Sequence, residues 1–188
     1  MSEDLLRGRL VRLTAESAKT LAEPYSRSSQ DSEYWRLETS DPARLFSVWN
    51  TEKELEKFLE KEPKVNEFYF SIRILEGDVQ IGDVGLGVVS WSSRDAFVGI
   101  GIGERAFWGK GYGTDAMQVA LRYAFQELNL RRVTLNTFAY NPRAIRSYEK
   151  AGFSHEGRVR GALSKDGNRY DVLYMGILRE EWAQKEEK

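Results

Sequence analysis

One glycine-rich segment carries residues whose spacing could bind a phosphate. Gly109, Gly111 and Gly113 alternate with other residues directly before a predicted helix that begins at Thr114. Glycines allow successive main-chain N–H groups to converge on one point, and the positive end of the helix dipole adds to them. This combination suits a phosphate or pyrophosphate. The alternative is a glycine-rich turn that only directs the helix.

The strand predicted before this segment has one face without side chains. Alternate strand residues point to opposite faces, so Gly99, Gly101 and Gly103 leave one face bare. The other face carries the side chains of Val98, Ile100 and Ile102. Glycine weakens a strand, so three on one face indicate the close approach of a ligand or another backbone. A bulge or a bulky neighbouring side chain would also explain them.

Two familiar nucleotide-binding motifs do not fit this segment. A P-loop requires glycine where Glu104 stands and Ser or Thr where Gly111 stands. The dinucleotide fingerprint requires a third glycine where Thr114 stands, and its strand should open a βαβ unit. We therefore exclude both motifs.

Composition bounds the class of protein. We predict a single domain over residues 1–188, because this length suits one domain. The 28 basic residues nearly balance 29 acidic ones, so we expect no nucleic-acid partner. The absence of cysteine, together with a single histidine, His155, excludes disulfides and multi-histidine metal sites, and we expect no metal.

The sequence contains no candidate membrane segment. No apolar run approaches the roughly 20 residues of a spanning helix, and the charged start MSEDLLRGRL lacks the apolar core of a signal peptide. We therefore expect no membrane partner and a cytoplasmic location. We expect the protein to be a monomer or a homodimer.

Periodicity predicts the elements that must position the glycine-rich segment. A terminal strand alternates apolar and basic residues, with large apolar residues at Leu6, Leu10 and Leu13. Residues 15–62 read as helical, and one helix is predicted to begin at a Thr51 cap with Glu54 completing a capping box.

Strands dominate the remainder. Three antiparallel strands follow Glu67, then a helix over 114–128, a strand, a helix over 142–151 capped by Asn141, two strands and a polar tail. The predicted fold is α+β, with a mixed, mostly antiparallel sheet of about seven strands in the order β-α-α-β-β-β-α-β-α-β-β.

Two motifs together resemble the acetyl-CoA signature of the GNAT superfamily of N-acetyltransferases. They are WGKGYGTDAM, residues 108–117, and NPRAIRSYEKAGF, residues 141–153. The resemblance runs from LLRGRLVRL to MGILREEW and is closest to the branch that acetylates N-termini of ribosomal proteins and related amines. It implies a GNAT-like sheet with helices on both faces. Trp108 departs from the pattern, which usually opens with Arg or Gln.

The resemblance implies acetyl-CoA as cosubstrate. Its pyrophosphate would be held by the main-chain amides of Trp108, Gly109, Lys110, Gly111, Tyr112, Gly113 and Thr114, with Lys110 adding charge. Its pantetheine arm would lie in a strand opening at Ile100, Gly101 and Ile102, where one amide would polarise the thioester carbonyl. Asn141 would touch that arm, and the phosphates would be reached by Arg143, Arg146 or Ser147.

The resemblance assigns Tyr148 as the acid that protonates the departing thiolate. Taken without the resemblance, Tyr148 shares a helical face with apolar residues and reads as a core tyrosine. In some relatives a glutamate accepts the proton of the amine, but the matching position here is Asn136, which cannot titrate. Glu104 or a chain of waters would replace it. We interpret His155 as an ordinary sheet residue.

The acceptor site is expected between residues 25–46 and 161–168, as in relatives. Within the first range, Glu33, Tyr34 and Trp35 are the candidate substrate-binding residues, with Glu38 and other acids beside them. Acidic and aromatic groups suit a cationic amine such as a peptide N-terminus, a polyamine or an aminoglycoside. A solvated loop would explain the same composition.

Three functions remain open. The leading hypothesis is an N-acetyltransferase that acts on a primary amine by direct attack in a ternary complex. A CoA-binding sensor or scaffold without turnover is the alternative, suggested by Asn136. A single-strand RNA binder that uses aromatic stacking is disfavoured by the neutral overall charge.

Overall fold

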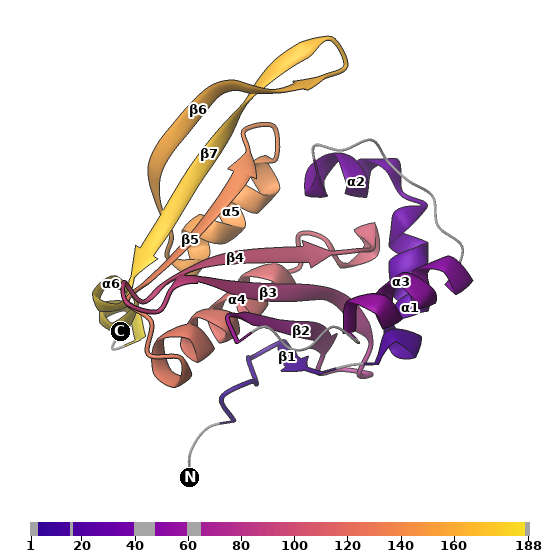
Figure 1. The fold of residues 1–188 in the computed structure, drawn as a ribbon, viewed down its shortest axis with the longest axis horizontal. Helices are drawn as coiled ribbons and strands as arrows, with labels where there is room; N and C mark the ends of the chain where they lie inside the picture. The colour runs from indigo at the N-terminus through magenta and orange to yellow at the C-terminus, as the bar shows by residue number, and fades with distance from the viewer. Residues whose placement is uncertain (1–3, 16, 40–47, 60–64, 187–188) are drawn as a thin grey trace.

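A computed structural model describes residues 4–15, 17–39, 48–59 and 65–186. One seven-stranded sheet runs through it in the order β1-β2-β3-β4-β5-β7-β6 (Figure 1). Only β4 and β5 are parallel neighbours; every other pair is antiparallel, which confirms the predicted sheet. The strands are β1 (Val11–Thr14), β2 (Glu67–Ile74), β3 (Gln80–Ser90), β4 (Asp95–Ile102), β5 (Arg132–Phe138), β6 (Ser154–Lys165) and β7 (Asn168–Leu178).

Helices connect these strands in the predicted order, with one helix more than expected before β2 and one after β7. The helices of the described residues are α1 (Ala18–Ser29), α2 (Ser32–Glu38), α3 (Val48–Leu59), α4 (Tyr112–Arg122), α5 (Pro142–Ala151) and α6 (Arg179–Glu186). A 3-10 turn, η1 (Arg105–Phe107), precedes α4, and a π-helical turn, η2 (Tyr123–Glu127), continues it. The long β6–β7 hairpin projects from the sheet at the end where α2 lies (Figure 1).

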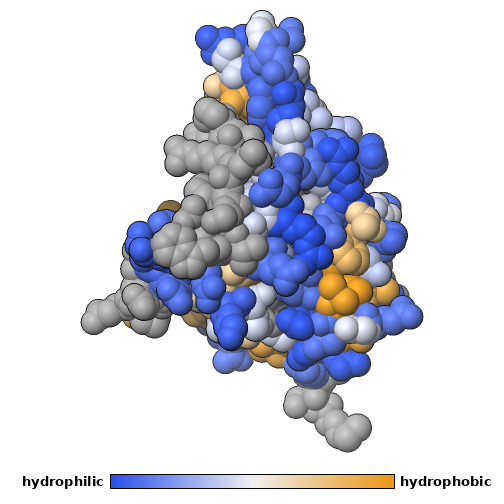
Figure 2. Space-filling model, turned by 90° about the vertical axis from the view of Figure 1, so that its right-hand side faces the viewer, coloured by the Kyte–Doolittle hydropathy of each residue, from blue (hydrophilic) through white to orange (hydrophobic). Residues whose placement is uncertain are grey.

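Helices cover both faces of the sheet, as the resemblance implied. On one face, a methyl group placed on Gly113 of α4 would lie 3.7 Å from the side chain of Ile102. On the other face, a methyl group placed on Gly103 would collide with the side chain of Ser28 on α1. Ile102, the last residue of β4, and Gly103, which follows it, therefore face α4 and α1 on opposite sides of the sheet. The surface that carries α1, α2 and α3 is largely hydrophilic (Figure 2).

The core lies between α4 and the sheet. Five apolar residues of α4 and η2 have no exposed surface, and they are Met117, Ala120, Leu121, Ala124 and Phe125. Full burial of each large side chain stabilises the fold by about 1.5–3 kcal/mol. The helix begins at Tyr112 rather than at the expected Thr114, because Gly111 takes up a left-handed conformation and caps it.

The first strand is shorter than its alternating pattern suggests. Only Val11–Thr14 pairs as β1, and Leu10, which belongs to the alternating pattern, lies before the strand and is 42% exposed. The cause is the buried carboxylate of Asp115 on α4, which accepts hydrogen bonds from the amides of Arg9 (3.1 Å), Leu10 (2.8 Å) and Val11 (2.9 Å). The chain therefore docks on a helix before it enters the sheet.

Two further expectations about helices are corrected. Thr51 is not an N-cap, because α3 already begins at Val48, and Glu54 pairs instead with Lys57 at 3.0 Å. The polar tail is helical, as α6, because Trp182 is buried against the ring of Phe125 with centroids 5.4 Å apart.

Candidate active site

The cleft originates where β4 and β5 separate. The two strands pair only between Asp95–Phe97 and Arg132–Thr134. Beyond these residues β4 continues to Ile102 against β3, and β5 continues to Phe138 against β7. Two strand edges therefore face each other without a partner strand among the described residues. A cavity of about 730 Å³ occupies this opening and extends over the sheet toward α2.

The open edge of β4 offers main-chain groups at Ile100 and Ile102. Gly103 donates its amide to Ile81 on β3 at 2.9 Å, so with a period of two the amides of Ile100 and Ile102 point toward the opening. The Ile102 carbonyl, on the same side, accepts a hydrogen bond of 2.7 Å from the indole of Trp108. Both isoleucines line the cavity, whereas Gly101 does not and faces Tyr34 and Glu38 of α2. Their part in cosubstrate binding stays a prediction.

The glycine-rich loop closes one end of the cleft. Gly109 and Gly111 have φ angles of +73° and +91°, which other residues rarely adopt, so the turn requires glycine at both positions. No side chain caps α4, and its first amides are open to a ligand. Most of the segment lines the cavity, namely Trp108, Gly109, Gly111, Tyr112, Gly113 and Thr114. Lys110 is exposed and lies outside this wall.

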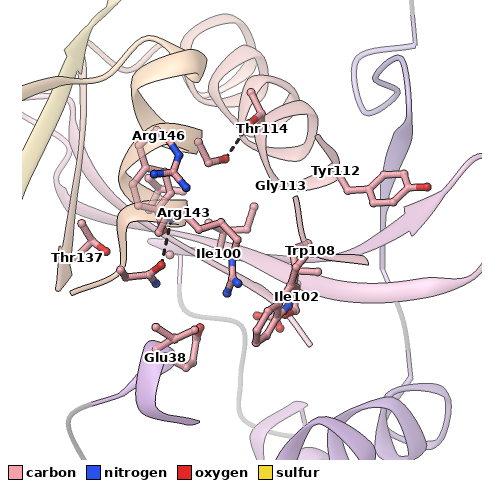
Figure 3. Close-up of a pocket in the computed structure, with 18 of the residues that line it drawn as sticks. Glu38, Ile100, Ile102, Trp108, Tyr112, Gly113, Thr114, Thr137, Arg143 and Arg146 are labelled. Atoms are coloured by element: carbon pink, nitrogen blue, oxygen red, sulfur yellow. Dashed lines mark hydrogen bonds between the residues drawn. The ribbon is translucent and has the colours of Figure 1, made fainter. Parts of the chain in front are cut away.

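Helix α5 supplies the opposite wall and its positive charge. Arg143 and Arg146 line the cavity, and the guanidinium of Arg143 lies 3.7 Å from the ring centroid of Trp108 (Figure 3). Ser147 shares a hydrogen bond of 2.8 Å with Thr114, which ties α5 to α4. This wall and the glycine-rich loop together form a concave, positively charged surface suited to an anion.

Tyr148 lies on α5, where the cleft meets the rest of the cavity. Helix α5 is fixed at both ends as predicted: Asn141 caps it by accepting the amide of Ala144 at 3.1 Å, and Gly152 ends it with a φ of +116°. The Tyr148 ring packs edge-on against Phe153, and the residue also lines the cavity, so it serves the core and the site together. Burial raises the pKa of Tyr148, which keeps its hydroxyl protonated at neutral pH.

Helix α2 presents one face to the cavity. Tyr34 and Glu38 are four residues apart and therefore lie on the same side of the helix, and both line the cavity (Figure 3 shows Glu38). Glu33 faces outward and pairs with Arg105 at 2.6 Å, and Trp35 donates its indole N–H to the carbonyl of Ser29 at 3.0 Å. Of the three expected substrate-binding residues, only Tyr34 reaches the cavity.

A second acid, not identified from the sequence, lies next to Glu38. Asp83 on β3 lines the cavity, and it accepts a hydrogen bond from the hydroxyl of Tyr25 on α1. Burial and the charge of Asp83 raise the pKa of Glu38 to about 7. The sequence does contain one signal for this site. A carboxylate stands in the middle of the apolar strand over 80–90, and a carboxylate is costly to bury.

The residues considered from the sequence as acceptors of the amine proton do not supply a base in the cavity. Asn136 lines the cavity but has no titrating proton. Glu104 pairs with Arg27 at 3.2 Å and is not among the residues that line the cavity, so the structure gives its expected role no support. His155 is on the edge strand β6, where its ring nitrogen contacts Glu149 at 3.0 Å, in agreement with its interpretation as a sheet residue. Asp41, among the acids of this region, falls outside the described residues.

Two classes of site have no support in the described part of the chain. Its residues contain no group of three or more His, Cys, Asp or Glu side chains that could hold a metal ion. None of its helices is long and apolar enough to cross a membrane.

Comparisons with known proteins agree with the geometry. A family model described as an acetyltransferase (GNAT) domain matches residues 7–154. YjcK of Bacillus subtilis (strain 168), named a probable N-acetyltransferase, is 31% identical over 134 residues, 71% of this chain and 74% of YjcK. YdaF of the same organism, named as a proposed ribosomal N-acetyltransferase, is 36% identical over 90 residues, 48% of this chain and 49% of YdaF. The chain thus spans about half to three-quarters of these relatives.

The fold is shared with a solved enzyme. The spermidine N-acetyltransferase from Vibrio cholerae, in complex with CoA and spermine, superimposes with a TM-score of 0.77 at 24% identity. The match covers 92% of this chain and 98% of that one. The architecture of the two chains is therefore the same over nearly their whole length.

Proposed function

Because this chain belongs to the GNAT acetyltransferase family, we propose that it transfers the acetyl group of acetyl-CoA to the primary amine of a small cationic acceptor. One observation carries the proposal: a single cavity joins a positively charged cleft to a pocket with two acids, and Tyr148 lines it within electrostatic reach of Glu38. A donor with phosphates and an acceptor with an ammonium group would each meet complementary charge.

The cleft fits the donor that this family uses. The amides at the start of α4 would hold the pyrophosphate, and Arg143 and Arg146 would neutralise its charge. The pantetheine arm would pair with the free edge of β4 at Ile100 and Ile102. Tyr148 would then protonate the departing thiolate, since its hydroxyl keeps its proton at neutral pH.

The pocket favours a cationic amine over other acceptors. Its wall includes the carboxyl groups of Glu38 and Asp83 and the rings of Tyr34 and Tyr69. Carboxylates and aromatic faces attract ammonium groups. The fold neighbour from V. cholerae is a spermidine acetyltransferase in complex with spermine, which supports a polyamine among the candidates. A peptide N-terminus, a cytoplasmic location and a monomeric or dimeric state stay predictions.

The sensor hypothesis is not favoured. It depended on Asn136, which leaves the usual strand position without a titrating group. Glu38 supplies such a group from α2, within the same cavity as Tyr148.

Calorimetry and thiol release together test the proposed function. We expect heat of binding when acetyl-CoA is titrated into the purified protein, and release of free thiol when a suitable amine is added. A matched acceptor pair isolates the acidic pocket: 1,4-diaminobutane should give a higher kcat/KM than butylamine, which lacks the second charge. Binding of acetyl-CoA without thiol release from any amine would favour the sensor, and no heat at all would reject both functions.

A further inference from the structure

The acceptor end of the cavity holds two carboxyl groups without a cation. Neither Glu38 nor Asp83 has a Lys, Arg or His neighbour that contributes to its electrostatics within the described ranges. Glu33, on the same helix, is paired with Arg105. Two carboxyl groups held side by side without a cation repel each other, so a site that keeps both of them indicates a function for the pair.

Gly101 brings the two carboxyl groups together. Asp83 is its direct cross-strand partner on β3. A methyl group placed on Gly101 would lie 3.2 Å from the Tyr34 hydroxyl and 3.4 Å from both carboxylate oxygens of Glu38. The Cβ positions of directly opposed strand residues are about 4.5–5.5 Å apart. Because Glu38 contacts the Cβ position of Gly101, its carboxyl group lies beside Asp83. The bare glycine face thus admits a carboxylate of the protein itself.

The groups facing Glu38 all disfavour its charged form or carry no charge. They come from four elements and are Tyr25 on α1, Tyr34 on α2, Asp83 on β3 and Tyr148 on α5. Desolvation by the surrounding cavity walls raises the pKa of Glu38 most and the charge of Asp83 raises it further, to about 7, a value suited to a general base at neutral pH. Desolvation raises the pKa of Asp83 as well, but the hydrogen bond that Asp83 accepts from the Tyr25 hydroxyl opposes this rise and favours the charged carboxylate.

We propose that Glu38 is the catalytic base, which accepts the proton that the acceptor ammonium must lose, and that Asp83 is its positioning residue. The inference rests on the proposed function. One proton passes from the ammonium to the Glu38 carboxylate, and the free amine forms a C–N bond with the thioester carbon. The C–S bond then breaks, the thiolate takes the Tyr148 proton, and the second amine proton restores Tyr148. Glu38 releases its proton to water, so one proton is produced for each acetyl group transferred.

The pH dependence of kcat, at saturating acetyl-CoA and amine, tests this role. In the wild-type protein kcat should rise with pH, with a slope of one on logarithmic axes, and level off above about pH 7. Glu38→Gln should lower kcat at pH 7 by about 10²- to 10⁴-fold. Its kcat should continue to rise toward the pKa of the amine, since only amine that is already neutral reacts.

Two controls separate catalysis from binding and from misfolding. Glu23→Gln removes one carboxylate from the exposed surface of α1 and should leave the pH profile unchanged. An amine of low basicity, neutral at pH 7, should be acetylated by Glu38→Gln at close to the wild-type kcat, which reports an intact site. A rise in KM with unchanged kcat for the basic amine would make Glu38 a binding residue and overturn the proposal.

Asp83→Asn tests the positioning role. Loss of the neighbouring negative charge should lower the pKa of Glu38, so the rising part of the kcat profile should move to lower pH while the plateau is kept. An unmoved profile would overturn the role of Asp83. If wild-type protein released no thiol with any amine, the proposed function itself would fail, which is distinct from an active enzyme whose Glu38→Gln profile matches the wild type.

Discussion

Lys165, near the tip of the β6–β7 hairpin, donates a hydrogen bond of 3.1 Å to the main-chain carbonyl of Arg36 in the last turn of α2. The same ammonium donates to the carbonyl of Thr39 at 3.2 Å, and the hydroxyl of Tyr140 donates to Arg36 at 2.6 Å. The side chain of Arg36 pairs with Asp166. Helix α2 has no buried residue, so these contacts hold Tyr34 and Glu38 over the cavity.

We predict that Lys165→Met weakens acceptor binding and spares the donor. The change removes a cation from the carbonyl end of α2, and a hydrogen bond to a charged group contributes about 1.5–3 kcal/mol. KM for the amine should rise about 10-fold or more, whereas the acetyl-CoA dissociation constant should stay within about 2-fold. Steady-state kinetics and calorimetry measure the two effects. Lys57→Met, on exposed α3, is the control, and an equal effect there would contradict the prediction.

Tyr148→Phe should lower kcat by about 10²- to 10⁴-fold without a change in acetyl-CoA affinity. The ring and its packing on Phe153 are kept, and only the proton donor is lost. Thiol release measures turnover, and calorimetry measures affinity. Tyr123→Phe makes the same change outside the cavity wall and should retain full activity. Wild-type turnover in Tyr148→Phe would reject the acid role.

Gly111→Ala should weaken both the fold and donor binding. Its φ of +91° costs an L-residue roughly 1–2 kcal/mol, which corresponds to a melting temperature lower by roughly 2–8 °C in a chain of this size. The amides at the start of α4 would move, so acetyl-CoA should bind more weakly. Gly113→Ala is the comparison, because its methyl group would make only ordinary contacts, the nearest at 3.7 Å, and its melting temperature should not fall. Equal melting temperatures for the two variants would count against the strain.

Asp115→Ala should destabilise the protein by about 3 kcal/mol or more. Three main-chain amides of residues 9–11 would lose a buried, charged acceptor at once. Denaturant unfolding measures the loss. Asp78→Ala removes an exposed carboxylate that also contacts the first strand, through Arg12, and should cost less than about 1 kcal/mol. Similar losses in the two variants would contradict our account of how the N-terminal segment is held.

Local signals allowed α5 and the glycine-rich loop to be predicted from the sequence. Asn141 and Gly152 mark both ends of α5 through capping chemistry that involves only neighbouring residues. The apolar spacing of Met117 and Phe125 likewise identifies the buried side of α4 and η2. These predictions hold because the determining contacts are close in sequence.

The acidic pocket could not be predicted in the same way. Asp83 and Tyr25 meet only because β3 and α1 pack together, and no local sequence pattern around either residue predicts the contact. The choice between Glu33 and Glu38 depends on the rotation of α2, which is set by Arg105 and by the distant hairpin. Thr51 is not a cap because α3 begins three residues earlier, at Val48.

Because β4 separates early from β5, the proposed site uses main-chain groups for the donor and side chains for the acceptor. The proposed donor contacts at the free strand edge are made by the polypeptide backbone, so we expect them to tolerate exchange of the side chains there. In the proposed function, the acceptor is instead chosen by side chains on a short helix and at a hairpin tip, and that helix has no buried residue. An engineer seeking new acceptors should therefore redesign residues 32–39 and 161–168 and leave the strand edges untouched.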